Sequence, residues 1–319
     1  MTEFEKYVVE EHIEDFNDRV ISRRELIRRV TLITGSTAAT MGLLTAMGCS
    51  AEPTGAPVSP TGRTTDNPQE FATPPAQPTQ DGITVQENDP RIKVSNLVVR
   101  GTDGVNLISY HASPASGASA GGILVIHENR GLVPHTKDVV RRVATAGFQA
   151  LAVDLLSRDG GADKLTDSAA YSAALSKRPV DAMVSDVREA LAALSSAGNG
   201  DKIGMTGFCF GGGMTWNSLA AGVQMKAAVP FYGPAPANVA ALASVKAAVF
   251  GVYAEKDARI TGSKDAVEAQ LKQSGQPYQV TVYPGVDHAF HNDTGARYNA
   301  AQAEAAWIAT IEWFRRHVI

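Results

Sequence analysis

The stretch Gly207-Phe208-Cys209-Phe210-Gly211 follows the apolar run from Lys202 to Thr206 and precedes the small residues that begin at Gly212. This order predicts a strand that turns sharply through Cys209 and enters a helix, leaving the thiol exposed above the sheet. Glycine is needed two residues before and two after the turn because the backbones crowd there and a Cβ atom would clash. The pattern therefore indicates a cysteine nucleophile. The alternative is a chance match in a glycine-rich chain, with Cys209 as a buried core thiol.

An acid and a histidine follow Cys209 in the chain, each just past a predicted strand. Residues 247–253 run into a loop that carries Asp257, and residues 278–283 are followed by His288. The carboxyl ends of parallel strands form the site of an open α/β sheet, so these side chains are expected at one rim. The order of nucleophile, acid and histidine is that of α/β-hydrolases. An imidazole can take the thiol proton while a carboxylate holds its other nitrogen, which predicts a catalytic triad.

Glu128 comes directly after the unbroken apolar run from Gly122 to His127, which is typical of a central parallel strand. A carboxylate there is either a surface loop charge or a site residue, and we favour the site because the second oxyanion donor of this fold lies in the same loop. Metal binding is not indicated, because Gly131 replaces the second histidine of the H-E-x-x-H pattern. His288 and His291 also lack a nearby cluster that would complete a metal site, so no cofactor is expected.

Five motifs together resemble the dienelactone hydrolase family of cysteine-dependent α/β-hydrolases, from about Arg91 to the end of the chain. The motifs are His127-Glu128-Asn129-Arg130-Gly131, Gly207-Phe208-Cys209-Phe210-Gly211, Phe231-Tyr232-Gly233, Glu255-Lys256-Asp257 and His288-Ala289-Phe290. The resemblance implies that Cys209 is the nucleophile, His288 the base and acid, and Asp257 its orienting carboxylate. It also implies that Glu128 contacts the resting thiol and helps to ionise it when substrate binds. The backbone amides of Phe210 and Asn129 would form the oxyanion hole.

The resemblance implies hydrolysis of a small ester or lactone through a thioester, without a metal or an organic cofactor. In the family, arginines hold the substrate carboxylate, and one lies four residues after the catalytic histidine, where this chain has Asn292. Arg158 and Arg130 are candidates to replace it, or else solvated surface charges. Tyr232 is a further candidate substrate contact. Two other functions stay open: a thioesterase or deacylase on the same triad, and a non-catalytic extracytoplasmic binding lipoprotein on a hydrolase fold.

The N-terminal segment, residues 1–49, resembles a twin-arginine export signal. Ser22-Arg23-Arg24-Glu25-Leu26-Ile27 carries the arginine pair, and Val30 to Gly48 is an uncharged, mildly apolar stretch. Cys49 after Gly48 resembles a lipobox, although Ala46 stands where leucine is usual. We expect export by the twin-arginine machinery and membrane attachment through a lipid on Cys49. The alternatives are a cleaved signal without lipid and an uncleaved anchor.

The remaining segments differ in composition. Glu3 to Asp18 is acidic and amphipathic, and the sequence does not indicate its function. Residues 50–88 are rich in Pro, Thr and Gly with few large apolar residues, which predicts a flexible linker. Residues 89–319 form the predicted catalytic domain. The chain has a formal net charge of −4 and no basic block, so a nucleic-acid partner is not expected.

The pattern of apolar runs predicts an α/β-hydrolase fold, with a mostly parallel doubly wound sheet and an antiparallel N-terminal hairpin. The hairpin is predicted from residues 92–100 and 105–110, and strands then alternate with helices. Residues 154–179 break this rhythm and are predicted to lie over the site as a partial lid. The predicted strands after the hairpin are 123–127, 149–153, 202–206, 227–231, 247–253 and 279–283, and the predicted helices are 136–146, 180–195, 212–221, 263–274 and 299–317.

Overall fold

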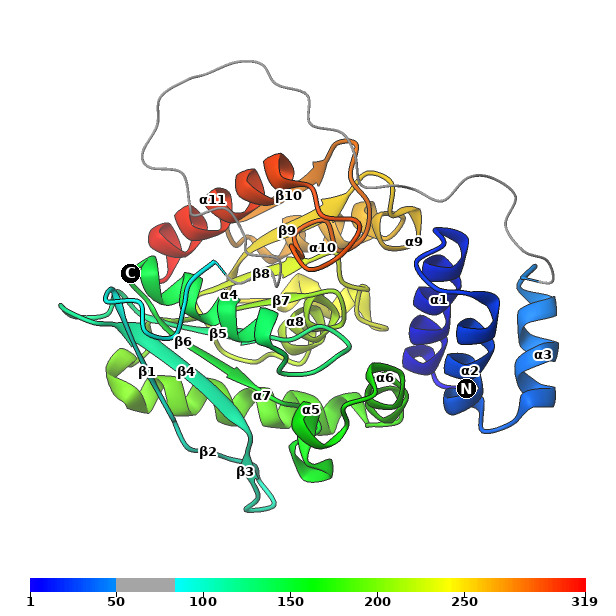
Figure 1. The fold of residues 1–319 in the computed structure, drawn as a ribbon. Helices are drawn as coiled ribbons and strands as arrows, with labels where there is room; N and C mark the ends of the chain where they lie inside the picture. The colour runs from blue at the N-terminus through cyan, green and yellow to red at the C-terminus, as the bar shows by residue number, and fades with distance from the viewer. Residues whose placement is uncertain (50–83) are drawn as a thin grey trace.

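The computed structural model describes residues 1–49 and 84–319. An eight-stranded sheet in the order β1-β4-β6-β5-β7-β8-β9-β10 forms its centre (Figure 1). The strands are β1 (Ile92–Ser95), β4 (Ser109–Pro114), β5 (Gly122–Ile126), β6 (Gln149–Val153), β7 (Ile203–Phe208), β8 (Ala227–Phe231), β9 (Ala248–Ala254) and β10 (Tyr278–Tyr283). A separate antiparallel pair consists of β2 (Val99–Arg100) and β3 (Asn106–Leu107).

The sheet is parallel from β6 through β5 and on to β10, and antiparallel at the edge formed by β1 and β4. Strands β5, β7 and β8 are buried along their whole length. Their continuous apolar runs fit this position, because helices cover both faces of the sheet. The predicted fold is confirmed, including the antiparallel hairpin. Every parallel strand therefore ends at the same rim, where the candidate site residues follow.

Helices cover both faces of the sheet, with α4 and α11 on one face and α7 and α8 on the other (Figure 1). The helices after residue 84 are α4 (Pro134–Thr145), α5 (Gly161–Lys164), α6 (Ser168–Ser176), α7 (Val180–Leu194), α8 (Phe210–Ala220), α9 (Ala258–Thr261), α10 (Lys264–Ser274) and α11 (Ala300–His317). The five predicted helices are present, with ends that differ by at most two residues from the predictions.

The segment 154–179 contains the helices α5 and α6 and is held together by Asp154. The Asp154 carboxylate accepts hydrogen bonds from the amides of Leu156 and Ala162, both at 2.9 Å, and from the Tyr171 hydroxyl at 2.6 Å. These bonds tie α5 and α6 to the end of β6. Helix α6 packs against the N-terminal helices, and no residue of this segment lines the pocket that contains Cys209. The predicted position of this segment as a lid over the site is therefore wrong.

Three helices precede residues 84–319, which contain the predicted catalytic domain and are called the catalytic body below. They are α1 (Glu3–Asn17), α2 (Arg23–Thr34) and α3 (Thr37–Ala46) (Figure 1). The uncharged stretch predicted as one signal region is divided between α2 and α3, because Gly35 ends α2 in the left-handed conformation and Ser36 caps α3. In residues 1–49 and 84–319 no helix has both the length and the apolar character needed to cross a bilayer.

Most of the predicted linker, residues 50–83, lies outside the described residues. Its last part already contacts the catalytic body, because the amides of Thr84 and Val85 donate to the Asp138 carboxylate of α4 at 3.1 and 2.8 Å. This contact holds Thr84 and Val85, which belong to the predicted linker, against α4.

Candidate active site

The turn from β7 into α8 has the geometry predicted from its glycines. Cys209 adopts φ 56° and ψ −119°, a conformation that costs about 1–3 kcal/mol for a residue with a side chain. A Cβ atom on Gly207 would lie 2.2 Å from the carbonyl oxygen of Gly211, and one on Gly211 would lie 2.4 Å from that of Ile126. Only glycine fits at both positions. The amide of Phe210 opens α8, so it has no acceptor within the helix and can face an oxyanion.

His288 and Asp257 meet Cys209 at this turn. The Nδ1 atom of His288 lies 2.7 Å from Oδ2 of Asp257, whose side chain is fully buried. The other carboxylate oxygen, Oδ1, accepts from the amide of Ile260 in α9 at 3.2 Å. A ring nitrogen of His288 lies within 4.8 Å of the Cys209 sulfur. The structure therefore brings together the three residues of the predicted triad, each from a different loop at the carboxyl ends of the strands.

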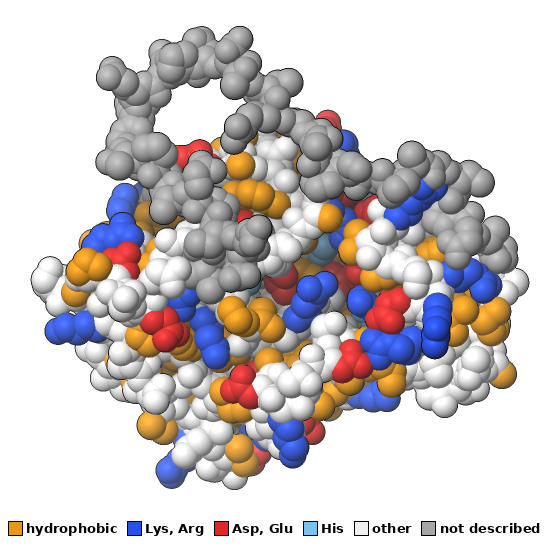
Figure 2. Space-filling model, viewed as in Figure 1, with side chains coloured by type: hydrophobic (Ala, Val, Ile, Leu, Met, Phe, Trp, Pro, Cys, Tyr) orange, Lys and Arg blue, Asp and Glu red, His pale blue; other side chains and the backbone are white. Residues whose placement is uncertain are grey.

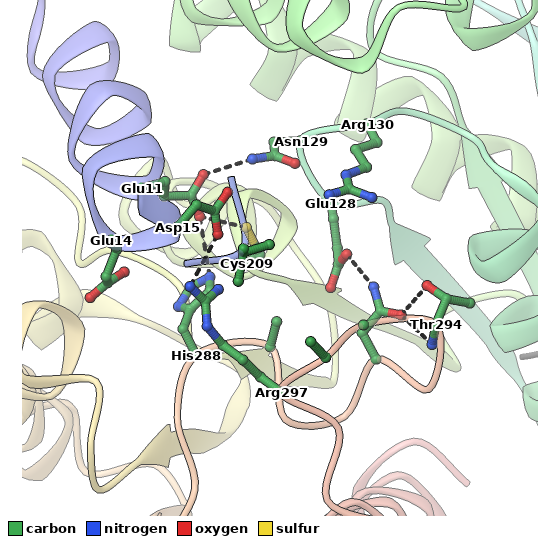
Figure 3. Close-up of a pocket in the computed structure, with 15 residues that line it drawn as sticks. Glu11, Glu14, Asp15, Glu128, Asn129, Arg130, Cys209, His288, Thr294 and Arg297 are labelled. Carbon is green, nitrogen blue, oxygen red and sulfur yellow. Dashed lines mark hydrogen bonds and ion pairs between the residues drawn. The ribbon is translucent and has the colours of Figure 1, made fainter. Parts of the chain in front are cut away.

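The residues Glu128, Asn129, Arg130 and Asn292 line the same pocket. The Nδ2 atom of Asn292 donates to Oε2 of Glu128 at 2.6 Å, so the residue that replaces the family's arginine holds this carboxylate (Figure 3). The negative charge of Glu128 acts on Cys209 from across the pocket. The direct contact with the resting thiol, which the resemblance assigns to Glu128, is made by a different carboxylate.

That carboxylate is Glu11 of helix α1. The Cys209 thiol donates to Oε1 of Glu11 at 2.9 Å, and Nε2 of His288 lies 3.2 Å from the same oxygen (Figure 3). The other oxygen, Oε2, accepts from Nδ2 of Asn129 at 2.8 Å, and the Tyr7 hydroxyl donates to Oε1 at 2.7 Å. Sequence reasoning assigned no function to this helix.

Burial and charge fix the protonation of this cluster. Burial raises the pKa of the Cys209 thiol, and the Glu11 carboxylate raises it further, to about 12. Burial lowers the pKa of His288, but the charges and hydrogen bonds of Asp257 and Cys209 together outweigh burial and raise that pKa well above its ordinary value. Burial would raise the pKa of Glu11, yet its contacts with His288 lower it overall. At neutral pH the cluster therefore holds a neutral thiol, an imidazolium and a carboxylate.

Three other predicted residues lie elsewhere. Arg158 does not reach the pocket, because its guanidinium is held by Asp103 at 2.6 Å and by Asp186 at 2.7 Å. The position of Arg158 outside the pocket does not support the prediction that it contacts the substrate. Tyr232 is fully buried and packs edge-on to His288, with ring centroids 5.2 Å apart, so it lies behind the histidine. Cys49, the predicted lipidation site, is buried in this structure.

One group of three potential metal ligands exists within residues 1–49 and 84–319, namely Glu11, Cys209 and His288. Their ligand atoms lie within 4.8 Å of one another, and all three side chains are buried. In this structure the three groups satisfy each other by hydrogen bonding and ion pairing.

Comparison with known proteins agrees with the fold. A protein of Methylorubrum extorquens AM1 named "Putative carboxymethylenebutenolidase" is 36% identical over 228 residues, which cover 67% of this chain and 78% of that protein. An Escherichia coli K12 protein of the same name is 31% identical over 231 residues, or 68% of this chain and 84% of that one.

Among solved structures, the "Putative Dienelactone Hydrolase" from Klebsiella pneumoniae superposes with a TM-score of 0.65 at 28% identity. That match covers 71% of this chain and all but 1% of the other. The family model described as "Dienelactone hydrolase family" matches residues 107–318, which include the elbow, the acid, the histidine and Glu128 but not helix α1. The chain therefore belongs to the dienelactone hydrolase family, whose members are hydrolases.

Proposed function

We propose that this chain hydrolyses small carboxylic esters or lactones through Cys209, with a thioester as the covalent intermediate. The observation that carries the proposal is the elbow thiol next to His288, whose far nitrogen is held by the buried Asp257 at 2.7 Å. The imidazole can accept the thiol proton, and Asp257 stabilises the imidazolium that forms. This is the arrangement that nucleophilic catalysis by a cysteine requires.

The proposed reaction has two halves. In its neutral form His288 takes the proton of Cys209. The thiolate then attacks the carbonyl carbon, and the amides of Phe210 and Asn129 bind the oxyanion. The C–O bond to the alcohol then breaks, and the alkoxide takes the proton from His288. A water molecule, deprotonated by His288, next attacks the thioester. Collapse of that intermediate releases the carboxylic acid and returns the proton to the thiol.

The side chains that line the pocket bear on the charge of the substrate. Asn292 donates to Glu128 and lacks the positive charge with which the family's arginine binds an anionic group. Arg130 and Arg297 also line the pocket, and Arg130 comes from the same loop as Glu128. We propose Arg130 as the residue that contacts any carboxylate of the substrate.

Export through the twin-arginine route and lipid attachment at Cys49 also remain proposals. The arginine pair stands at the first turn of α2, where Arg24 is exposed and accessible to a receptor. An exported enzyme with one catalytic thiol would benefit from a protonated resting state, because the thiolate is the form that oxidises.

A substrate panel tests the proposed activity. Activated esters, lactones and thioesters are incubated with the full-length chain, and with Glu11→Ala, which removes the carboxylate that covers the thiol. Peptide mapping then locates any acyl group on Cys209 or Cys49. We expect ester or lactone turnover and an acyl group on Cys209, both absent from Cys209→Ala. Turnover that persists in Cys209→Ala would exclude the thioester mechanism, and a preference for thioesters would indicate the thioesterase alternative.

A further inference from the structure

Helix α1 lies across the mouth of the active site. Figure 2 shows acidic and histidine side chains in a hollow beside the N-terminal helices, with Lys or Arg side chains around it. Only 4% of the Cys209 surface and 4% of the His288 surface remain exposed. The cavity left beside α1 measures about 100 Å³, whereas pockets for small molecules usually measure about 300–1,000 Å³. The helix therefore fills most of the space that a substrate needs.

The contacts of Glu11 are those that a substrate would need. An attacked carbonyl carbon must lie about 3–3.5 Å from the sulfur, yet Oε1 of Glu11 already lies 2.9 Å from it. The same carboxylate contacts the catalytic ring nitrogen of His288 and takes the Asn129 side chain as a donor. Substrate and docked α1 therefore exclude each other.

Two arginines of the catalytic body hold the rest of the helix. Arg259 binds Glu14 at 3.1 Å and stacks its guanidinium 4.8 Å from the centre of the Tyr7 ring. Arg297 binds Asp15 at 3.1 Å and Asp18 at 2.7 Å. The contacting positions 7, 11, 14, 15 and 18 recur every three or four residues, so they form one face of the helix.

We propose that the active-site cleft of this protein is a docking site for an acidic amphipathic helix, and that α1 is its occupant within the same chain. While α1 is docked, Glu11 excludes the substrate and keeps the thiol in its protonated form. The site becomes active when α1 leaves. The consequence for catalysis rests on the proposed hydrolase function, whereas the docking itself rests only on the contacts described above.

Charge reversal on α1 tests the docking in the full-length chain. The variant Asp15→Lys with Asp18→Lys opposes Arg297 with two like charges. The matched control, Glu3→Lys with Glu10→Lys, makes the same change of charge on the same helix at positions without an ion pair to the catalytic body among the described residues. Two rates are measured: iodoacetamide alkylation of Cys209 by peptide mapping, and turnover of a p-nitrophenyl ester.

We expect both rates to rise at least tenfold in the first variant and to stay within twofold of wild type in the control. A rise in alkylation without any ester turnover supports the docking and contradicts the proposed hydrolase. Unchanged rates in a variant that keeps the wild-type melting temperature would overturn the proposal. A fall in ester turnover would also overturn it, because α1 would then belong to the catalytic machinery.

Two further measurements separate docking from a general loosening of the fold. Addition of Arg297→Asp to the charge-reversed variant should restore the opposite charges and return the alkylation rate toward wild type. A synthetic peptide of residues 1–18 should protect Cys209 of the charge-reversed variant, and the same peptide with Glu11→Ala should protect it less. A peptide that gives no protection at millimolar concentration, together with a charge swap that restores nothing, contradicts the proposal.

Discussion

Replacement of Glu11 by glutamine should make Cys209 much more reactive. The change keeps the shape of the side chain and its ability to accept the thiol hydrogen, but it removes the negative charge 2.9 Å from the sulfur. A negative charge beside a thiol disfavours the thiolate, so its removal lowers the pKa of Cys209 from about 12. Two unit charges 4 Å apart interact by about 4 kcal/mol at an effective dielectric constant of 20.

The positive charge of the His288 imidazolium, which also pairs with Glu11, offsets part of this repulsion between the carboxylate and the thiolate. Even if only about a third of it is realised, the thiolate population rises about tenfold. Loss of the charge also weakens the docking of α1, which acts in the same direction. We therefore expect iodoacetamide to alkylate Cys209 of Glu11→Gln at least ten times faster than wild type at pH 7.

The assay follows alkylation of the Cys209 peptide between pH 5 and 10, with Glu10→Gln as the control. Glu10 neighbours Glu11 but pairs with Lys6 of its own helix. The alkylation profile of Glu11→Gln should shift to lower pH, whereas that of Glu10→Gln should match wild type. Equal alkylation rates for all three proteins at every pH in this range would refute the electrostatic role of Glu11.

The other predictions concern the triad, the elbow and the location of the protein. In a background with α1 released by Asp15→Lys and Asp18→Lys, Asp257→Asn should lower ester turnover by about 10³–10⁴-fold, because the histidine loses its orienting carboxylate; a loss below tenfold would contradict this role. Gly211→Ala should lower the melting temperature by several degrees, since its Cβ atom meets the Ile126 carbonyl at 2.4 Å, whereas Gly42→Ala, which meets no atom within 4 Å, should not. Arg23→Lys with Arg24→Lys should retain the protein in the cytoplasm in cell fractionation; export of this variant at the wild-type level would exclude the twin-arginine route.

The catalytic body could be predicted because its signals are local. The apolar runs of β5, β7 and β8 are buried along their whole length. The glycines at 207 and 211 indicate the sharp turn at Cys209, because no Cβ atom fits at either position. The triad follows from the order of residues after strands, since parallel strands bring their carboxyl ends to one rim. The structure places Cys209, Asp257 and His288 together as that order predicts.

The position of α1 could not be predicted in the same way. Its amphipathic pattern indicates a helix with one buried face, but the docking surface comes from residues about 120 to 280 positions later in the chain. The position of Arg158 could not be predicted either. Its guanidinium forms ion pairs with Asp103 and Asp186, and both are too far away in the sequence for a local pattern to reveal them. The periodic spacing of Tyr7, Glu11, Glu14, Asp15 and Asp18 is the one signal that marks this face in the sequence.

Because α1 is covalently linked to the catalytic body, its docking should not depend on the protein concentration. A tethered helix meets its cleft at an effective concentration of about millimolar, whatever the concentration of the protein. The fraction of closed molecules in the intact chain should therefore be the same in a dilute and in a concentrated sample. Once the chain is cut between Cys49 and Thr84, the two parts form an ordinary complex that dissociates on dilution. After a single cleavage, inhibition by α1 would therefore depend on concentration. Dilution into a large compartment would then relieve it.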